Sequence, residues 1–223
     1  MEIREYLDTV ASQLVNELRP ILEIKGVTAN TDLLGKYTEA SVRGLIHRIV
    51  HPMRVSTGAV LDHPVPTPLR QIDIIVWAPF PAPALFDVQG FGLVPKSSAF
   101  GVIEVKRSNY SGVEADLESF LADVAAKRIV ADAEGSIRDY QRSPGLGVIC
   151  VLEATLSSRL KSLIDEGKVV AIFEKNENTT RVRPKDVLSL VNFLHFVTWR
   201  YRVHGSQPAY PQINTAHFPR EGT

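Results

Sequence analysis

The sequence has one cysteine, no net charge and no apolar run long enough to form a membrane helix. Its 223 residues include 25 Lys and Arg against 25 Asp and Glu. The single cysteine, Cys150, excludes an intrachain disulfide and fits a cytosolic protein. A membrane helix needs a run of ~18 apolar residues. We therefore expect no membrane partner.

The N-terminus also lacks the features of a targeting segment. Its first 20 residues are amphipathic and carry four acidic side chains, at Glu2, Glu5, Asp8 and Glu17. A signal peptide has a continuous apolar core, and a transit peptide is poor in acidic residues. We therefore expect a cytoplasmic location.

The absence of net charge bears on nucleic-acid binding. Proteins whose main task is to coat nucleic acid are usually strongly basic. If this chain binds a phosphate backbone, the positive charge must come from a local patch, a bound cation or an oligomer. Charge alone therefore disfavours a pure nucleic-acid-binding module.

The order of hydrophobic patterns predicts one α/β domain. Residues 2–19 have helical periodicity that Pro20 ends or bends, and a second helix is expected over about 38–50, with Thr38 as its cap. The later part alternates strands and helices, which favours a mixed or partly parallel sheet flanked by helices. Strands are expected at 54–62, 70–78, near 91–95, and at 99–108, 146–152 and 168–174, and helices at about 113–133, 156–166 and 185–201.

These patterns predict three parts of the chain. Residues 1–30 form an N-terminal helical extension, residues 31–203 form the α/β domain, and residues 204–223 form a loosely ordered C-terminal tail. The last 20 residues lack periodicity and contain three prolines.

The stretch "AFGVIEVKRS", residues 99–108, places two charges inside an apolar strand. E-x-K triplets occur three times in the sequence, and the two others lie at a helix end and in a polar turn. Side chains alternate along a strand, so Glu104 and Lys106 share one face. Charged residues are rarely buried unless something pairs with them.

The preceding strand repeats the anomaly, since Asp73 interrupts the apolar run "QIDIIVWA". If the two strands pair, cross-strand Cβ atoms approach to ~5 Å, and Asp73 and Glu104 converge. Two close carboxylates repel each other. Protonation of one acid, compensation by Lys106 or a bridging divalent cation would each relieve the repulsion. Mg²⁺ prefers oxygen ligands and needs only one or two carboxylates, so the pattern favours a metal site.

A third acid belongs to the predicted second helix. Glu39 falls in a narrow arc with Val42, Ile46 and Ile49, beside the stripe that faces the core. It is therefore expected to reach the same cation, directly or through water.

A glutamate on a first helix, an aspartate in one strand and E-x-K in a following strand resemble the PD-(D/E)XK nuclease superfamily. The resemblance covers about residues 32–133 and is closest to a family of uncharacterised prokaryotic proteins. Asp73 follows Ile72 where the motif has proline. The resemblance implies a restriction-endonuclease-like core of order α-β-β-β-α-β and metal-dependent hydrolysis of phosphodiester bonds, with DNA as the expected substrate.

The resemblance also implies roles for individual residues. Asp73 and Glu104 would bind Mg²⁺ or Mn²⁺, with the Val105 carbonyl as a further ligand, and Lys106 would position the attacking water. Glu39 would hold the water shell of the metal or a second ion. Polar residues that contact substrate are expected at Lys127, on the helix after E-x-K, and at Gln71.

Two other interpretations of this residue set stay open. A nuclease fold can persist as a scaffold without activity, and the charges can form a purely structural cluster. The alternative function is a non-catalytic interaction or regulatory domain that reuses the fold and works as a homodimer.

Overall fold

The computed structural model describes residues 2–61, 69–80, 82–126, 143–153, 156–177 and 179–206. Six α-helices and eight strands are assigned in these ranges, and short 3₁₀ turns lie at Asn16–Leu18, Ile24–Gly26 and Lys96–Ser98. The helices are α1 (Ile3–Leu14), α2 (Pro20–Glu23), α3 (Thr31–Ile49), α4 (Val113–Ala125), α5 (Ser158–Asp165) and α6 (Pro184–Ser206). The strands are β1 (Arg54–Leu61), β2 (Ile72–Trp77), β3 (Phe86–Val88), β4 (Phe91–Pro95), β5 (Ala99–Ser108), β6 (Gly145–Glu153), β7 (Val169–Lys175) and β8 (Thr180–Val182).

All eight strands form one mixed sheet in the order β3-β4-β1-β2-β5-β6-β7-β8. The β2 strand lies antiparallel between β1 and β5, while β5, β6 and β7 run parallel. Parallel pairing requires crossover connections, which α4 and α5 provide in the chain order. The predicted mixed sheet flanked by helices is confirmed.

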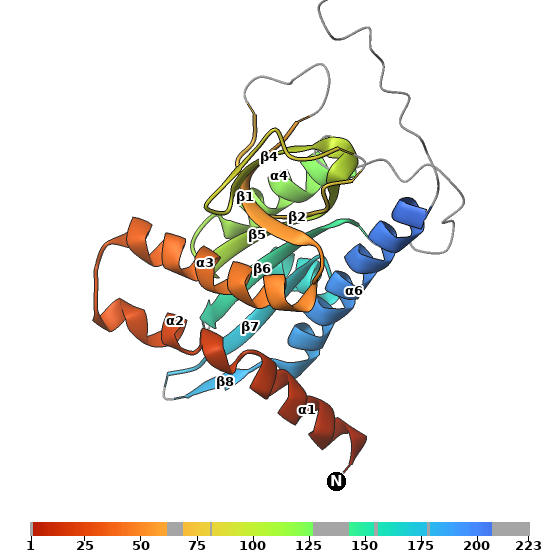
Figure 1. The fold of residues 1–223 in the computed structure, drawn as a ribbon. Coiled ribbons are helices and arrows are strands. Elements are labelled where there is room, and N and C mark those ends of the chain that lie inside the picture. The colour runs from red at the N-terminus through yellow and green to blue at the C-terminus, as the bar shows by residue number, and fades with distance from the viewer. Residues whose placement is uncertain are drawn as a thin grey trace, which may run out of the picture.

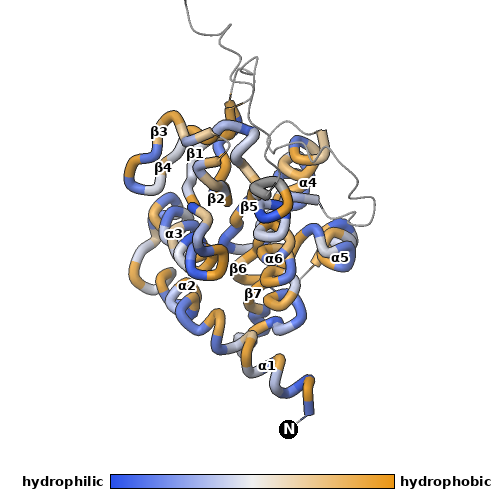
Figure 2. Tube along the Cα trace, turned by 45° about the vertical axis from the view of Figure 1, so that its right-hand side comes forward, coloured by the Kyte–Doolittle hydropathy of each residue, from blue (hydrophilic) through white to orange (hydrophobic). Residues whose placement is uncertain are grey.

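Helices cover both faces of the sheet (Figure 1). On one face, α3 and α6 enclose the largest apolar cluster, which includes Val42, Leu190, Ile74 and Ile103. On the other face, Phe120 and Leu117 of α4 and Leu160 of α5 close two smaller clusters. Hydrophobic residues are frequent in the central strands, where orange segments lie inside the molecule (Figure 2). The product is a three-layer arrangement in which a charge on a central strand is enclosed by helices.

The N-terminal helices differ in detail from the prediction. The α3 helix begins at Thr31, and its cap is Asn30, whose side-chain oxygen accepts from the backbone N–H groups of Asp32 and Leu33. Thr38 lies inside the helix, where its hydroxyl donates to the Leu34 carbonyl, so its prediction as a cap is wrong. Gly35, although glycine is a poor helix former, lies inside this long, well-capped helix.

Pro20 begins a helix and does not end one. The α1 helix already ends at Leu14, and Pro20 occupies the first turn of α2. Proline suits that position because the first helical N–H groups have no intrahelical partner in any case.

The ends of the described chain contact the domain in different ways. Ala11 and Val15, together with Leu18 and Ile21, are buried in the main core, so residues 2–30 contribute to it. The first turns of α1 stand away from the body (Figures 1 and 2), and Ile3 is exposed there. At the other end, α6 continues to Ser206. Within the described ranges, no helix is both long enough and apolar enough to span a bilayer.

Candidate active site

Strands β2 and β5 bring the two predicted acids together. Their antiparallel register pairs Ile75 with Val102 and Ile74 with Ile103. Continued by one residue, this register would set Asp73 opposite Glu104, on the same face of the sheet. The Val105 N–H also donates to Asp73 Oδ2 at 2.8 Å. The strand pairing that the site requires is therefore present.

The site faces the α4 layer. Glu104 and Lys106 alternate with Val105, which packs into the core on the α3 side. Val102, two residues before Glu104, packs with Phe120 of α4. Val105 of β5 therefore faces the α3 layer, while Glu104 and Lys106 face the α4 layer, as Val102 does.

Burial favours the neutral form of the Asp73 carboxyl and raises its pKa. The charge of Glu104 raises the pKa further. The hydrogen bond from Val105 and the charge of Lys106 lower it only in part, so the pKa is about 7. Glu104 itself is only 8% exposed. The two acids therefore lie where negative charge is costly unless a cation compensates it.

Lys106 supplies part of that compensation. Its Nζ lies 3.0 Å from Glu104 Oε1. Burial lowers the pKa of Lys106, but the hydrogen bond to Glu104 and the charge of that carboxylate outweigh burial, and the net shift is upward. The side chain therefore remains an ammonium group, able to donate hydrogen bonds.

Glu39 lies near the pair without joining it in a tight cluster. It is half-buried on α3, and burial, followed by the charge of Glu104, raises its pKa. Across the described part of the chain, no three or more His, Cys, Asp or Glu side chains gather closely enough to hold one metal. The charge of Glu104, which acts on Glu39, is what connects it to the pair.

The positions of the other predicted site residues say less about a function. Gln71 is exposed just before β2. Val105 lies within β5 between the two charged residues. Lys127 lies outside the described residues.

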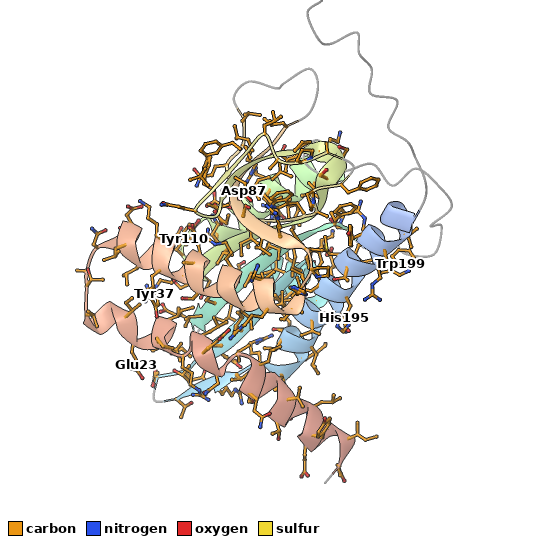
Figure 3. The ribbon with its side chains drawn as sticks, in the orientation of Figure 1. Glu23, Tyr37, Asp87, Tyr110, His195 and Trp199 are labelled. Carbon is orange, nitrogen blue, oxygen red and sulfur yellow. The ribbon has the colours of Figure 1, made fainter. Side chains whose placement is uncertain are left out.

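Two polar residues next to Lys106 were missed by the sequence analysis. Asp116 Oδ2, in the first turn of α4, lies 3.8 Å from Lys106 Nζ, and the Tyr110 hydroxyl donates to the same oxygen. Figure 3 labels Tyr110, which follows the end of β5. The turn between them contains Gly112 at φ 98°, and this conformation sets the direction of α4. In the sequence, the only sign of this contact is an acidic residue, Asp116, in the first turn of the helix after E-x-K. That sign does not determine the direction of the helix.

The donor set fits a hard divalent cation. Asp73 and Glu104 offer carboxylate oxygens, the type of ligand that Mg²⁺ and Mn²⁺ prefer. A bound cation would also offset the repulsion by Glu104, which adds to burial in raising the pKa of Asp73. A stable core has no need of this arrangement, because apolar residues of similar size often serve at least as well.

Comparison with known proteins supports the fold. No family model matches the chain, and no curated protein matches it. Among solved structures, NucC from P. aeruginosa ATCC27853 in its cAAA-bound form is similar, with a TM-score of 0.54 and 15% identity over 88% of this chain and 92% of that one. The cAAA-bound NucC of E. coli MS115-1 gives 0.54 and 16% identity over 88% and 91%. The chain therefore has a restriction-endonuclease-like fold.

Proposed function

We propose that this protein is a metal-dependent nuclease that hydrolyses phosphodiester bonds, with DNA as substrate. The observation that carries the proposal is that Asp73 of β2 accepts a hydrogen bond from β5 at the residue next to Glu104, with the Lys106 ammonium against Glu104. The fold likeness to NucC, a nuclease, supports the same class of reaction.

Asp73 and Glu104 would hold Mg²⁺ or Mn²⁺, with the Val105 carbonyl as a further ligand. Such an ion lowers the pKa of bound water and neutralises charge on the transferring phosphate. Asp73 must release its proton to serve as a ligand, which its pKa of about 7 permits at neutral and higher pH.

Lys106 would orient the attacking water and donate to the developing negative charge on the phosphate. Water adds to phosphorus as the bond to one sugar oxygen breaks, which leaves one phosphate end and one hydroxyl end. A fixed ammonium in a partly water-excluded site stabilises that charge more strongly than it would in water. Glu39 would position water in the outer shell of the metal, and Gln71 and Lys127 would contact the substrate.

Cleavage assays test the proposal. Purified protein is incubated with single- and double-stranded DNA and RNA, with Mg²⁺, Mn²⁺ or EDTA, beside the Asp73→Ala and Lys106→Ala variants. Cleavage should require the metal and should fall at least ~100-fold in both variants, while both remain folded. Glu166→Ala, which alters an E-x-K pair in a surface turn, serves as the matched control and should retain activity.

Absence of cleavage on every substrate, together with absence of metal binding in calorimetry, would contradict the proposal. It would favour a non-catalytic domain that reuses the fold. The zero net charge of the chain is the observation that favours this second function.

A further inference from the structure

Lys106 has two carboxylates within reach, and they belong to different elements. Its Nζ lies 3.0 Å from Glu104 Oε1 on its own strand and 3.8 Å from Asp116 Oδ2 on α4. An ammonium group has three donors, so the two contacts are compatible. The shorter one engages an acid that a metal ion would also need.

The position of Asp116 is fixed by its neighbours. The Tyr110 hydroxyl donates to the Asp116 oxygen that faces Lys106. Burial raises the pKa of Tyr110, and the bond to Asp116 raises it further, so the phenol keeps its proton and remains a donor. Just before Tyr110, the side chain of Asn109 bonds to both the N–H and the carbonyl of Glu153, which fastens this turn to the end of β6.

Close packing brings the start of α4 toward the site. Gly147 of β6 pairs with Glu104 in the parallel register. A Cβ at Gly147 would lie 2.8 Å from Leu117 Cδ2, inside normal contact distance. Glycine at this position therefore lets Leu117 approach the sheet next to Glu104, and Asp116 adjoins Leu117 in the helix.

We propose that Asp116, braced by Tyr110, is a positioning residue that receives the Lys106 ammonium when a divalent cation occupies Glu104. The inference rests on the proposed function, because it requires the cation site. With a cation bound at Glu104, the two positive charges would repel each other, and Lys106 would lose an acceptor on that carboxylate. Asp116 offers a second carboxylate that Lys106 reaches with a small movement of its flexible side chain, so Lys106 stays at the site.

A double-mutant cycle measured by calorimetric titration with Mg²⁺ tests the inference. The four proteins are wild type, Asp116→Asn, Lys106→Ala and the double variant. Because Asp116 is half-exposed, Asp116→Asn should weaken Mg²⁺ binding by a modest factor of about three when Lys106 is present. In the Lys106→Ala background, the same change should leave the Mg²⁺ affinity unchanged within error, because Asp116 then has no ammonium group to bind.

Two further variants sharpen the cycle. Tyr110→Phe keeps Asp116 but removes its brace, and should weaken Mg²⁺ binding by about twofold. Glu118→Gln removes one carboxylate from the same helix, where it pairs with Arg159, and should leave affinity unchanged.

The possible outcomes separate this inference from the proposed function. Equal loss of affinity in both backgrounds, or no loss from Asp116→Asn, overturns the positioning role and leaves the metal site standing. A wild-type protein that fails to bind Mg²⁺ overturns both.

Discussion

Asp73 places a carboxyl group inside an apolar strand. A leucine or valine would suit its place between Ile72 and Ile74, both fully buried. The carboxylate instead accepts a single backbone hydrogen bond and faces a second acid. Such a residue lowers the stability of the metal-free fold, and a raised pKa at this kind of position is typical of functional sites.

The raised pKa gives a prediction for stability against pH. Asp73 binds its proton more tightly in the folded protein, where its pKa is about 7, than at its ordinary value of 3.8. The stabilisation that the protonated Asp73 gives the folded protein is therefore fully present below about pH 4. It is lost as pH rises to about 7. Asp73→Asn keeps an oxygen that can accept from Val105 but cannot ionise.

In EDTA, Asp73→Asn should therefore unfold at a higher temperature than wild type at pH 8. At pH 8 its free energy of unfolding should exceed that of wild type by about 1–2 kcal/mol, and this difference should narrow toward pH 5. Thermal melts at several pH values measure it, with Asp165→Asn as an exposed control of the same chemistry. A variant that is less stable than wild type at pH 8 would indicate a structural role for the carboxylate.

At the residue scale, the sequence was sufficient to select the residues of the candidate site. Alternation along residues 99–108 and the interruption at Asp73 identified three side chains that the structure brings together. Tyr110 and Asp116 could not be selected, because their contact depends on the turn at Gly112 and on helix packing against β6. Neither leaves a periodic signal.

At the scale of elements, the predicted strands that lie inside the sheet were found, and short edge strands were missed. The β3 and β8 strands have three residues each and lie at the two ends of the sheet. Half-exposed strands of this length carry too few side chains for alternation to be recognised. The start of α3 was missed for another reason: Gly35 lies in its second turn, and glycine is a poor helix former.

The cap of α3 is open to a direct test. Asn30→Ala removes an acceptor for two backbone N–H groups and should cost about 1 kcal/mol of unfolding free energy. Urea denaturation measures it. Asn30→Ser should restore most of the loss, because serine also caps well; equal loss in both variants would show that capping is not the cause.

The irregularity in β1 gives a second test at this scale. The β1–β2 register shifts between Ser56 and Gly58, and Gly58 has φ +143°. A Cβ at Gly58 would lie 2.0 Å from the Gly92 carbonyl oxygen in the neighbouring strand. Gly58→Ala should therefore cost more than about 2 kcal/mol.

Gly44→Ala provides the matched control for Gly58→Ala. Gly44 lies within α3 with no atom within 4 Å of an added Cβ. Alanine there should raise stability by about 0.5–1 kcal/mol, since it restricts the unfolded chain. Similar effects of the two substitutions in chemical denaturation would contradict the close approach of β1 and β4.

At the scale of the whole molecule, the absence of net charge bears on how the protein would bind a phosphate backbone. A chain with no net charge gains little from long-range attraction to a phosphate backbone. A divalent cation at Asp73 and Glu104 would supply positive charge where the reaction needs it. The order of strands and helices predicted a mixed sheet flanked by helices. A fold alone does not determine an activity.

The most direct test of the central claim is the change in melting temperature that Mg²⁺ causes at pH 8, relative to EDTA, in wild type and in Asp73→Asn. At ~100 times the dissociation constant, bound Mg²⁺ should stabilise wild type by about 2.7 kcal/mol, a shift of roughly 5 °C for a domain of this size. We expect this shift in wild type and little or none in Asp73→Asn. Equal shifts in both proteins, or no shift in wild type, would contradict a cation site at Asp73 and Glu104.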